Sequence, residues 1–439
     1  MLTPALLRKI QPDPSVPSLP IYRKTVLPNG IRIVSEQVSH VRSIAVGVWV
    51  DVGSRDEDHS NNGISHFLEH MVFKGTRRYS ANQIARSLEA FGGYLNAFTT
   101  KEHTCFYARI LDDQLPRAMD ILSDLVQHPT LDLKEMEKEK TVILEELKNI
   151  EDDPDDLIHE YFDRNLYHQH PLGFPIIGRA ENIRGFNKTS LLRYIGRFYT
   201  SNRLVVSAVG NFRHEDLVGL AEKYFRLPVG KPGRSDRVAS PRNMKPRKEF
   251  FHKPINQAHV CYGTLGYGVR STYRYSLLVL NTILGEGMSS RLFQNIREKY
   301  GFAYSIYSFL SLMSDTGNFG VYIGTDPSKV DKSVDLIRKE IDKLRSGRIG
   351  AEEIRRAKAQ LKGTTMLGME SMSNRMMRLG SGELYFHEFV SLDQVLRRID
   401  AVTHDDIAAV AYKLLNHENF STVVISPSAP KTESLGNVA

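Results

Sequence analysis

Residues 63–76 read GISHFLEHMVFKGT, in which His66, Glu69 and His70 form the pattern His-x-x-Glu-His. On an α-helix each residue turns by about 100°, so His66 and His70 lie about 40° apart on one face, with Glu69 beside them. Two imidazoles one turn apart can bind one zinc ion, and a neighbouring carboxylate can accept a proton from a water molecule on the metal. The stretch therefore predicts a zinc-binding helix.

The order of these residues is the inverse of the His-Glu-x-x-His motif of zinc proteases, and it is known as the inverzincin form. The alternative is that His66 and His70 are ordinary core or surface histidines, because such a pattern arises by residue frequency alone in roughly one or two chains per hundred of this size. The motif by itself leaves both interpretations open.

Length and composition are typical of a globular protein with two domains or more. The chain has 439 residues, of which 41% are hydrophobic and 25% are charged. It contains no apolar run long enough for a transmembrane helix, so no membrane partner is expected. Residues 1–21 lack the pattern of a secretory signal, and we expect an extended N-terminal arm. Cys105 and Cys261 lie in apolar, strand-like runs, which favours free thiols in a reducing compartment.

The net charge is +7, and much of the excess lies in residues 231–248. The basic residues of this stretch are Lys231, Arg234, Arg237, Arg242, Lys245, Arg247 and Lys248. Prolines and a glycine lie among them, which predicts an exposed interdomain linker. No aromatic residue interleaves with the charges, so a nucleic-acid surface is the weaker interpretation and no nucleic-acid partner is expected.

The order of predicted helices and strands recurs along the chain. A helix at 190–200 followed by a strand at 204–210 is repeated as a helix at 405–415 and a strand at 420–425, at a spacing of about 215 residues. The repeat predicts an α+β fold with two tandem homologous domains, each a mixed β-sheet covered by helices. The second copy lacks the His-x-x-Glu-His pattern at its equivalent helix, so we expect one metal site.

We place the domain boundaries where the composition changes. The metal-binding, catalytic domain is expected at 22–230, the basic linker at 231–248 and the second homologous domain, without a metal motif, at 249–427. Residues 428–439 are expected to form a flexible C-terminal tail.

A helix predicted at 134–150 offers candidates for a third ligand. A catalytic zinc ion needs three protein ligands and one open position. Glu139 and Glu146 are two turns apart and lie within about 20° of each other on one face of this helix. From the residues alone, a solvated charged helix is an equally open interpretation.

The stretch 66–76 (HFLEHMVFKGT), followed by 139–146 (EKTVILEE), resembles the M16 peptidases, the family of pitrilysin, insulin-degrading enzyme and the mitochondrial processing peptidase. The resemblance extends from about Tyr22 to Pro427 and is strongest to the processing-peptidase branch. It implies a fold that assembles as half of a clamshell. Lys140 stands where the family usually has arginine.

The resemblance implies one Zn²⁺ ion per chain, bound by His66, His70 and Glu146. Glu69 would be the general base, and Glu139 would orient a ligand histidine from the second shell of the site.

The resemblance also implies residues that bind substrate. Phe73 corresponds to a position that lines the pocket for the residue just after the cut. Asn96, Ala97 and Phe98 correspond to an edge strand that pairs with the substrate backbone, although an ordinary paired strand is the alternative.

Asp156 and Glu160 match two acids that, in processing peptidases, bind an arginine near the cleavage site. This match would favour substrates with basic residues near the cut. A polar loop leading into a helix is the alternative.

The stretch 289–305 (SSRLFQNIREKYGFAYS) resembles the arginine–tyrosine motif of the family, with Arg297 and Tyr304 as catalytic residues that stabilise the developing oxyanion and hold the substrate backbone. The alternative is that Arg297 pairs with a surface acid and Tyr304 packs in the core. In the clamshell, this motif and the metal motif face each other from opposite halves. We therefore expect a homodimer in which Arg297 and Tyr304 of one chain complete the zinc site of the other.

The resulting prediction is a zinc metalloendopeptidase that cleaves extended peptides or unfolded polypeptide segments. The alternative is a non-catalytic, peptide-binding or core-subunit member of the same family, but such chains usually have a broken metal motif. Because no presequence is recognisable, we expect a bacterial cytoplasmic protein rather than one of the mitochondrial matrix.

Overall fold

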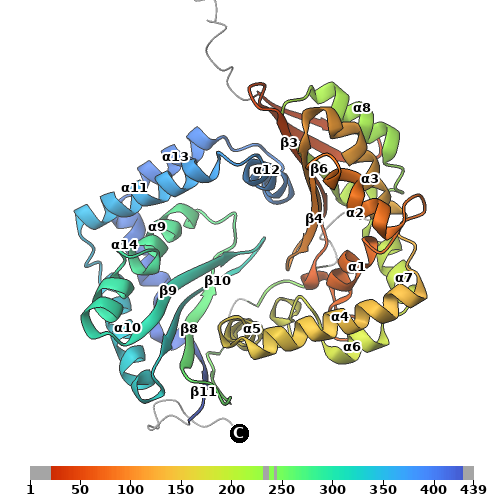
Figure 1. Ribbon diagram of the computed structural model, residues 1–439. Helices are drawn as coiled ribbons and strands as arrows, with labels where there is room; N and C mark the ends of the chain where they lie inside the picture. Colours follow the sequence, from red (N-terminus) through yellow and green to blue (C-terminus); the bar gives the residue numbers. More distant parts are fainter. Residues whose placement is uncertain (1–20, 231–236, 242–244, 429–439) are drawn as a thin grey trace, which may run out of the picture.

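The computed structural model describes residues 21–230, 237–241 and 245–428 (Figure 1). The expected N-terminal arm apart from Ile21, half of the expected linker (231–236 and 242–244) and the expected tail apart from Ser428 lie outside the described residues. The remainder forms two halves, each built on one mixed β-sheet, which confirms the predicted α+β class.

The first half contains most of the elements that surround the predicted metal helix. In chain order these are β1 (Ile21–Val26), β2 (Arg32–Gln37), β3 (Ser43–Val50), η2 (Ser54–Asp56), α1 (Ile64–Val72), α2 (Ala81–Glu89), β4 (Tyr94–Thr99), β5 (Thr104–Leu111), η3 (Asp112–Gln114), α3 (Leu115–Gln127), α4 (Leu133–Asp152), α5 (Pro154–Tyr167), η4 (Pro171–Gly173), α6 (Ala180–Gly185), α7 (Lys188–Phe198), η5 (Ser201–Arg203), β6 (Leu204–Gly210) and α8 (His214–Tyr224).

The second half repeats this order with fewer elements. They are β7 (Lys248–His252), β8 (Ala258–Gly266), α9 (Arg274–Gly285), the π-helix η6 (Phe293–Glu298), β9 (Ala303–Leu312), β10 (Gly317–Thr325), η7 (Pro327–Lys329), α10 (Val330–Arg345), α11 (Ala351–Gly368), α12 (Met372–Phe386), α13 (Leu392–Ala401), α14 (His404–Leu414), η8 (His417–Asn419) and β11 (Ser421–Ser426).

The strand orders show the internal duplication directly. Within the described residues, the first sheet has the order β1-β2-β6-β3-β5-β4 and the second has the order β7-β11-β8-β10-β9. In each sheet one parallel pair, β2 with β6 or β7 with β11, lies beside antiparallel strands. The second sheet therefore matches the first without β1, which confirms two homologous units.

The central strands of both sheets are apolar and fully buried. All seven residues of β6 and all nine residues of β10 are buried. Such strands need cover on both faces, because an apolar face left in water would forgo the free energy of burial. Cys105 on β5 and Cys261 on β8 are free and buried, as expected.

Each sheet receives one covering helix from the other half of the chain. Helix α12 belongs to the second half, yet its residues Met376 and Leu379 share a buried cluster with Trp49 of β3 and Val205 of β6. Conversely, α5 of the first half packs on β8 and β11 of the second sheet. Figure 1 shows both helices between the two sheets. The halves are therefore interlocked rather than joined in series.

A buried charge network also joins the halves. Arg55 of η2 contacts Glu102 at 2.7 Å and Asp315, from the turn between β9 and β10, at 2.6 Å. Arg237 pairs with Asp56 at 2.8 Å, and its side chain is only 5% exposed. The prediction of an exposed linker is therefore wrong at Arg237, because acids of the first half draw this residue into the interface between the halves.

The membrane prediction can be checked against the helices themselves. None of the helices in the described ranges is long and apolar enough to cross a bilayer.

Candidate metal centre

Contacts at the N-terminus of helix α1 fix its position. Gly63, its N-cap, has φ +97°, a conformation that favours glycine, and a Cβ there would lie 2.6 Å from the Cα of Gly178. The buried Glu57 carboxylate accepts hydrogen bonds from Gly63 N at 2.8 Å and from Ser65 N at 2.9 Å. The first N–H groups of a helix have no partner within the helix, so by accepting their hydrogen bonds Glu57 fixes the direction in which α1 presents its histidines.

The structure brings His66 and His70 of α1 together with Glu146 of α4. One donor atom of each lies within 4.8 Å of the others. His66 Nε2 is 3.8 Å from Glu146 Oε1, and His70 Nε2 is 3.6 Å from Glu146 Oε2. Donors at about 2.0–2.2 Å from a tetrahedral zinc ion lie about 3.3–3.5 Å apart, so small side-chain movements would fit all three.

The protonation state of the site also suits a metal. Burial, and then the nearby His70, lower the pKa of His66 to about 3, so this imidazole is neutral at pH 7, the form that binds metals. Its Nδ1 atom is buried and has no hydrogen-bond partner in the described ranges. The Glu146 side chain is 42% exposed, which leaves access for water at a fourth position. The residues therefore fit a catalytic zinc ion.

Glu139 lies behind His70, on the side away from the other donors. Its Oε1 atom is 2.9 Å from His70 Nδ1, and its Oε2 atom is 2.7 Å from Lys74 Nζ. Burial opposes ionisation, but these two contacts lower the pKa of Glu139 overall. The carboxylate thereby holds the proton on Nδ1 and leaves His70 Nε2 free to bind a metal.

Glu69 points toward the end of strand β4. Thr99 Oγ1 donates a hydrogen bond of 2.5 Å to Glu69 Oε2. Burial raises the pKa of Glu69, and the hydrogen bond from Thr99 and the charge of His70 oppose that rise. A carboxylate with a raised pKa is a better proton acceptor, which suits a general base.

Strand β4, which carries Asn96, Ala97 and Phe98, is the last strand of the first sheet. It pairs with β5 on one side, and no described strand pairs with its other side. Of the two interpretations of this strand, the edge strand is therefore the one observed. It ends at Thr99, beside Glu69. Phe73, the C-cap of α1, packs against the core of the first half and is partly exposed.

Asp156 and Glu160 lie one turn apart on α5. Asp156 is exposed, whereas Glu160 is mostly buried and its Oε2 atom has no hydrogen-bond partner among the residues described. The pKa of Glu160 is raised overall, mainly by burial. The charge of Lys101 opposes the rise, and the charges of Asp163 and Asp156 add to it. Both residues lie within helix α5 itself, not in a loop that leads into it, and Glu160 has one buried oxygen atom without a hydrogen bond from any described residue.

Tyr304 is exposed to solvent, and Arg297 is partly exposed. Tyr304 is 79% exposed, so it does not pack in the core, and Arg297 lies 5.7 Å from its ring centroid. Arg297 belongs to the π-helix η6 and makes no ion pair with any described acid. No contact joins either residue to His66, His70 or Glu146 within the described part of this chain.

Three polar residues of the site were not predicted from the sequence. Thr99 holds Glu69, Lys74 holds Glu139, and Glu57 caps α1. Lys74 follows His70 by one helical turn, which is a signal that could have placed it beside an acid bound to His70. Thr99 and Glu57 reach the site only through the fold, and we find no sequence signal for them.

Comparisons with known proteins agree with this geometry. The sequence model of the insulinase family (peptidase family M16) matches residues 32–180, and the model of the peptidase M16 inactive domain matches residues 185–361. A Bacillus subtilis protein named uncharacterized zinc protease YmxG is 40% identical over 400 residues, which are 91% of this chain and 97% of that protein. An uncharacterized zinc protease of Streptomyces coelicolor is 40% identical over 418 residues, 94% of this chain and 91% of that protein.

Solved structures share the fold at lower identity. A protease from Helicobacter pylori superposes with a TM-score of 0.88 at 23% identity and covers 93% of this chain and 100% of that one. A peptidase M16 inactive domain from Pseudomonas fluorescens gives a TM-score of 0.87 at 19% identity, covering 94% and 99%. The family models together with the two relatives at 40% identity show that this chain belongs to the M16 peptidase family.

Proposed function

We propose that the protein is a zinc-dependent endopeptidase that holds one Zn²⁺ ion per chain. The convergence of His66, His70 and Glu146, with Glu69 beside them on the same helix, carries the proposal. When bound there, zinc would supply Lewis-acid chemistry, polarising a peptide carbonyl and activating water.

Side chains of the protein would transfer the proton and orient the metal ligands. Glu69 takes the proton from the attacking water and delivers it to the leaving amine, because it is held by Thr99 next to the ligand histidines. Glu139 keeps His70 in one tautomer.

The edge of β4 supports an extended substrate. A peptide added as a further strand beside Asn96, Ala97 and Phe98 would satisfy the unpaired backbone groups of that edge and run toward Glu69. Phe73 would line the pocket for the residue after the cut. The acids Asp156 and Glu160 would favour a basic side chain near the cut.

Tyr304 supports a homodimer. Its large aromatic side chain is 79% exposed and lies beside Arg297, which has no ion-pair partner among the described residues, so burial of Tyr304 at an interface would be favourable. We place Arg297 and Tyr304 of one chain at the zinc site of the other, so that two chains form the closed clamshell.

The proposal is tested by cleavage of a quenched, arginine-containing peptide by the wild type and by Glu69→Gln, with zinc measured in both. We expect zinc in both proteins and a rate at least about 10²-fold lower in the variant. Zinc in both and cleavage in neither would favour the alternative of a non-catalytic, peptide-binding member. Cleavage by a zinc-free protein would refute the site.

A further inference from the structure

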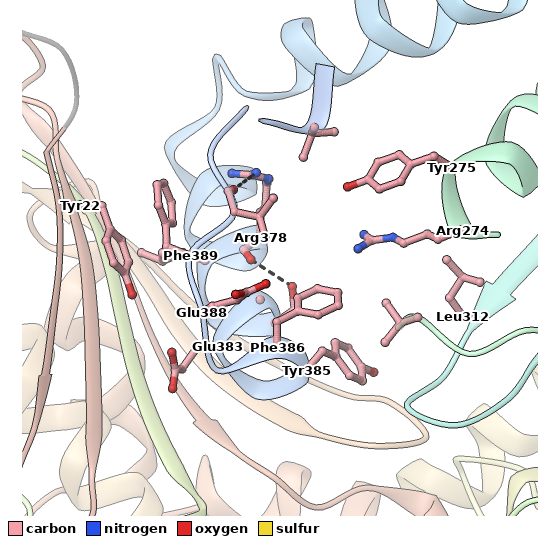
Figure 2. Close-up of a pocket in the computed structure, with 16 residues that line it drawn as sticks. Tyr22, Arg274, Tyr275, Leu312, Arg378, Glu383, Tyr385, Phe386, Glu388 and Phe389 are labelled. Atoms are coloured by element: carbon pink, nitrogen blue, oxygen red, sulfur yellow. Dashed lines mark hydrogen bonds between the residues drawn. The ribbon is translucent and has the colours of Figure 1, made fainter. Parts of the chain in front are cut away.

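A cavity of about 270 Å³ lies away from the metal centre, at the junction of α9, α12 and β1. Figure 2 shows Arg274 and Tyr275 reaching from α9 toward α12, which carries Arg378 and Phe386. Tyr22 of β1 closes the opposite side and stacks on Phe389 with ring centroids 4.1 Å apart. The cavity therefore contains residues from both halves of the chain.

Arg274 is a cation without an acidic partner among the described residues. Its Nε atom is buried without a hydrogen-bond acceptor, and no acid in the described ranges forms an ion pair with it. Burial lowers the pKa of Arg274, the neighbouring Tyr275 opposes this shift, and the charge of Arg398 adds to it. It is also the first residue of α9, where the positive end of the helix dipole disfavours a cation. An anion at this position would relieve both penalties.

Arg378 contributes a second cation to the same cavity. One of its N–H groups donates to the backbone oxygen of Val390, and no described carboxylate lies within ion-pair distance of it. Glu36, the acid whose charge acts on it, is paired with Arg375 at 3.2 Å. The guanidinium is thus only partly satisfied.

The acids that line the cavity do not neutralise these arginines. Glu383 is buried and pairs with Lys24 at 2.8 Å and with Arg32 at 3.6 Å, both of which come from the first sheet. Glu388 is exposed and contacts neither Arg274 nor Arg378. The cavity therefore keeps an excess of positive charge.

The rest of the lining is mostly apolar. The guanidinium carbon of Arg274 lies 5.1 Å from the ring centroid of Phe386 and 5.5 Å from that of Tyr275. Leu312 of β9 lies on the same side as Arg274 and Tyr275, and Val269 and Val395 also line the cavity. The Tyr275 hydroxyl is buried, has no hydrogen-bond partner in the part of the chain that the structure describes, and is a further donor.

We propose that this cavity binds a small carboxylate with an apolar or aromatic body. The carboxylate would accept hydrogen bonds from Arg274, Arg378 and Tyr275, since a guanidinium fork matches a carboxylate in geometry and charge. The apolar body would lie against Phe386 and Leu312. A free carboxylic acid and the C-terminal carboxylate of a short peptide present the same chemistry.

The test uses the full chain carrying Glu69→Gln, so that no probe peptide is cut. Binding of 3-phenylpropionate and of its neutral amide is measured by calorimetry and by ligand-observed NMR. We expect saturable binding of the acid and at least about tenfold weaker binding of the amide. Arg274→Gln should weaken binding of the acid by about tenfold to a hundredfold, because a charged hydrogen-bond donor is lost.

Arg397→Gln is the matched control, since Arg397 is exposed on the neighbouring α13 and does not line the cavity. It should bind the acid as the parent does, and thermal unfolding should show that each variant is folded. Equal binding of acid and amide, unchanged binding in Arg274→Gln, or no saturable binding would overturn the proposal.

A second pair of probes, acetyl-Gly-Gly-Phe with a free or an amidated C-terminus, identifies the source of the carboxylate. Binding of the free-acid peptide that depends on Arg274 supports the site and assigns it to peptide C-termini. Binding of 3-phenylpropionate alone supports the site and assigns it to free carboxylic acids. Because none of these measurements uses peptidase activity or zinc, their outcome is separate from that of the proposed function.

Discussion

Arg55 and Asp315 are joined by two parallel hydrogen bonds, of 2.6 and 2.8 Å, across the junction of the two halves. Arg55 lies just before the metal helix α1, and Asp315 lies in the turn between β9 and β10. Paired bonds between a guanidinium and a carboxylate fix orientation as well as distance. This contact therefore holds the second half in a defined position relative to the metal centre.

We expect Asp315→Asn to lower stability in a pH-dependent way. Burial opposes ionisation, but the hydrogen bonds and charge of Arg55 lower the pKa of Asp315 to about 2. A carboxyl group whose pKa is lower in the folded than in the unfolded state, where it is about 4, stabilises the fold above pH 4. That contribution is lost as the pH falls from about 4 to 2.

The measurement is urea unfolding of both proteins from pH 7 downward. At pH 7 the free energy of unfolding of the variant should be lower by about 1 kcal/mol. The loss is small because Arg55 keeps its ion pair with Glu102 and because solvent screens the partly exposed Asp315. The difference should shrink below pH 4. Asp113→Asn, at an exposed acid, is the control, and a difference that does not depend on pH would contradict the assignment.

We expect Gly380→Ala to destabilise the packing of α12 on the first sheet. A Cβ on Gly380 would lie 2.2 Å from Trp49 Nε1, and this indole nitrogen donates to Ser207 Oγ at 2.8 Å. Overpacking should lower the free energy of unfolding by about 1–3 kcal/mol. This loss should exceed the gain of about 1 kcal/mol that alanine brings over glycine in helix propensity. Thermal unfolding would measure the sum.

Gly382 provides the matched control on the same helix. A Cβ there meets no atom within 4 Å, so Gly382→Ala should leave stability unchanged or raise it by up to about 1 kcal/mol. Equal effects of the two substitutions would show that the contact with Trp49 does not limit the approach of α12.

Removal of the charge that supports His70 should weaken metal binding. Glu139→Gln loses the carboxylate that faces His70 Nδ1 and Lys74 Nζ, and we expect zinc affinity to fall by about 10- to 100-fold. Competition with a chelator would measure it. Glu145→Gln, on the exposed side of α4 where Glu145 pairs with Lys148, should bind zinc normally. An unchanged zinc affinity in Glu139→Gln would show that Glu139 does not support metal binding by His70.

Mixing two inactive variants tests the assembly. Glu69→Gln and Tyr304→Phe should each lose about 10²-fold in rate or more. If Tyr304 acts on the partner's zinc site, a mixed dimer contains one site with an intact Glu69 from one chain and an intact Tyr304 from the other. Activity should therefore return after mixing. If both residues act within one chain, every site in the mixture stays defective and no activity returns.

The periodicity of the sequence was sufficient to predict most of the helices and strands. The metal helix predicted around His66, the strand predicted at 204–210 and the duplicated order of elements all appear in the structure. The start of helix α5 at Pro154 was not predicted, although an aspartate followed by a proline and two further acids is a signal for a helix N-terminus. The pairing of Glu139 with His70 required the family resemblance, since a charged helical face has the same spacing.

The sequence by itself determined which residues could bind a metal and that the fold is repeated, because both depend on spacing along a helix or along the chain. Only the tertiary structure decided that α5 and α12 each cover the other half's sheet, since an amphipathic pattern does not specify which apolar surface it will meet. It also decided that Arg237 is buried and that Thr99 reaches Glu69. Those contacts join residues distant in sequence, and their geometry exists only once the sheets and helices have packed.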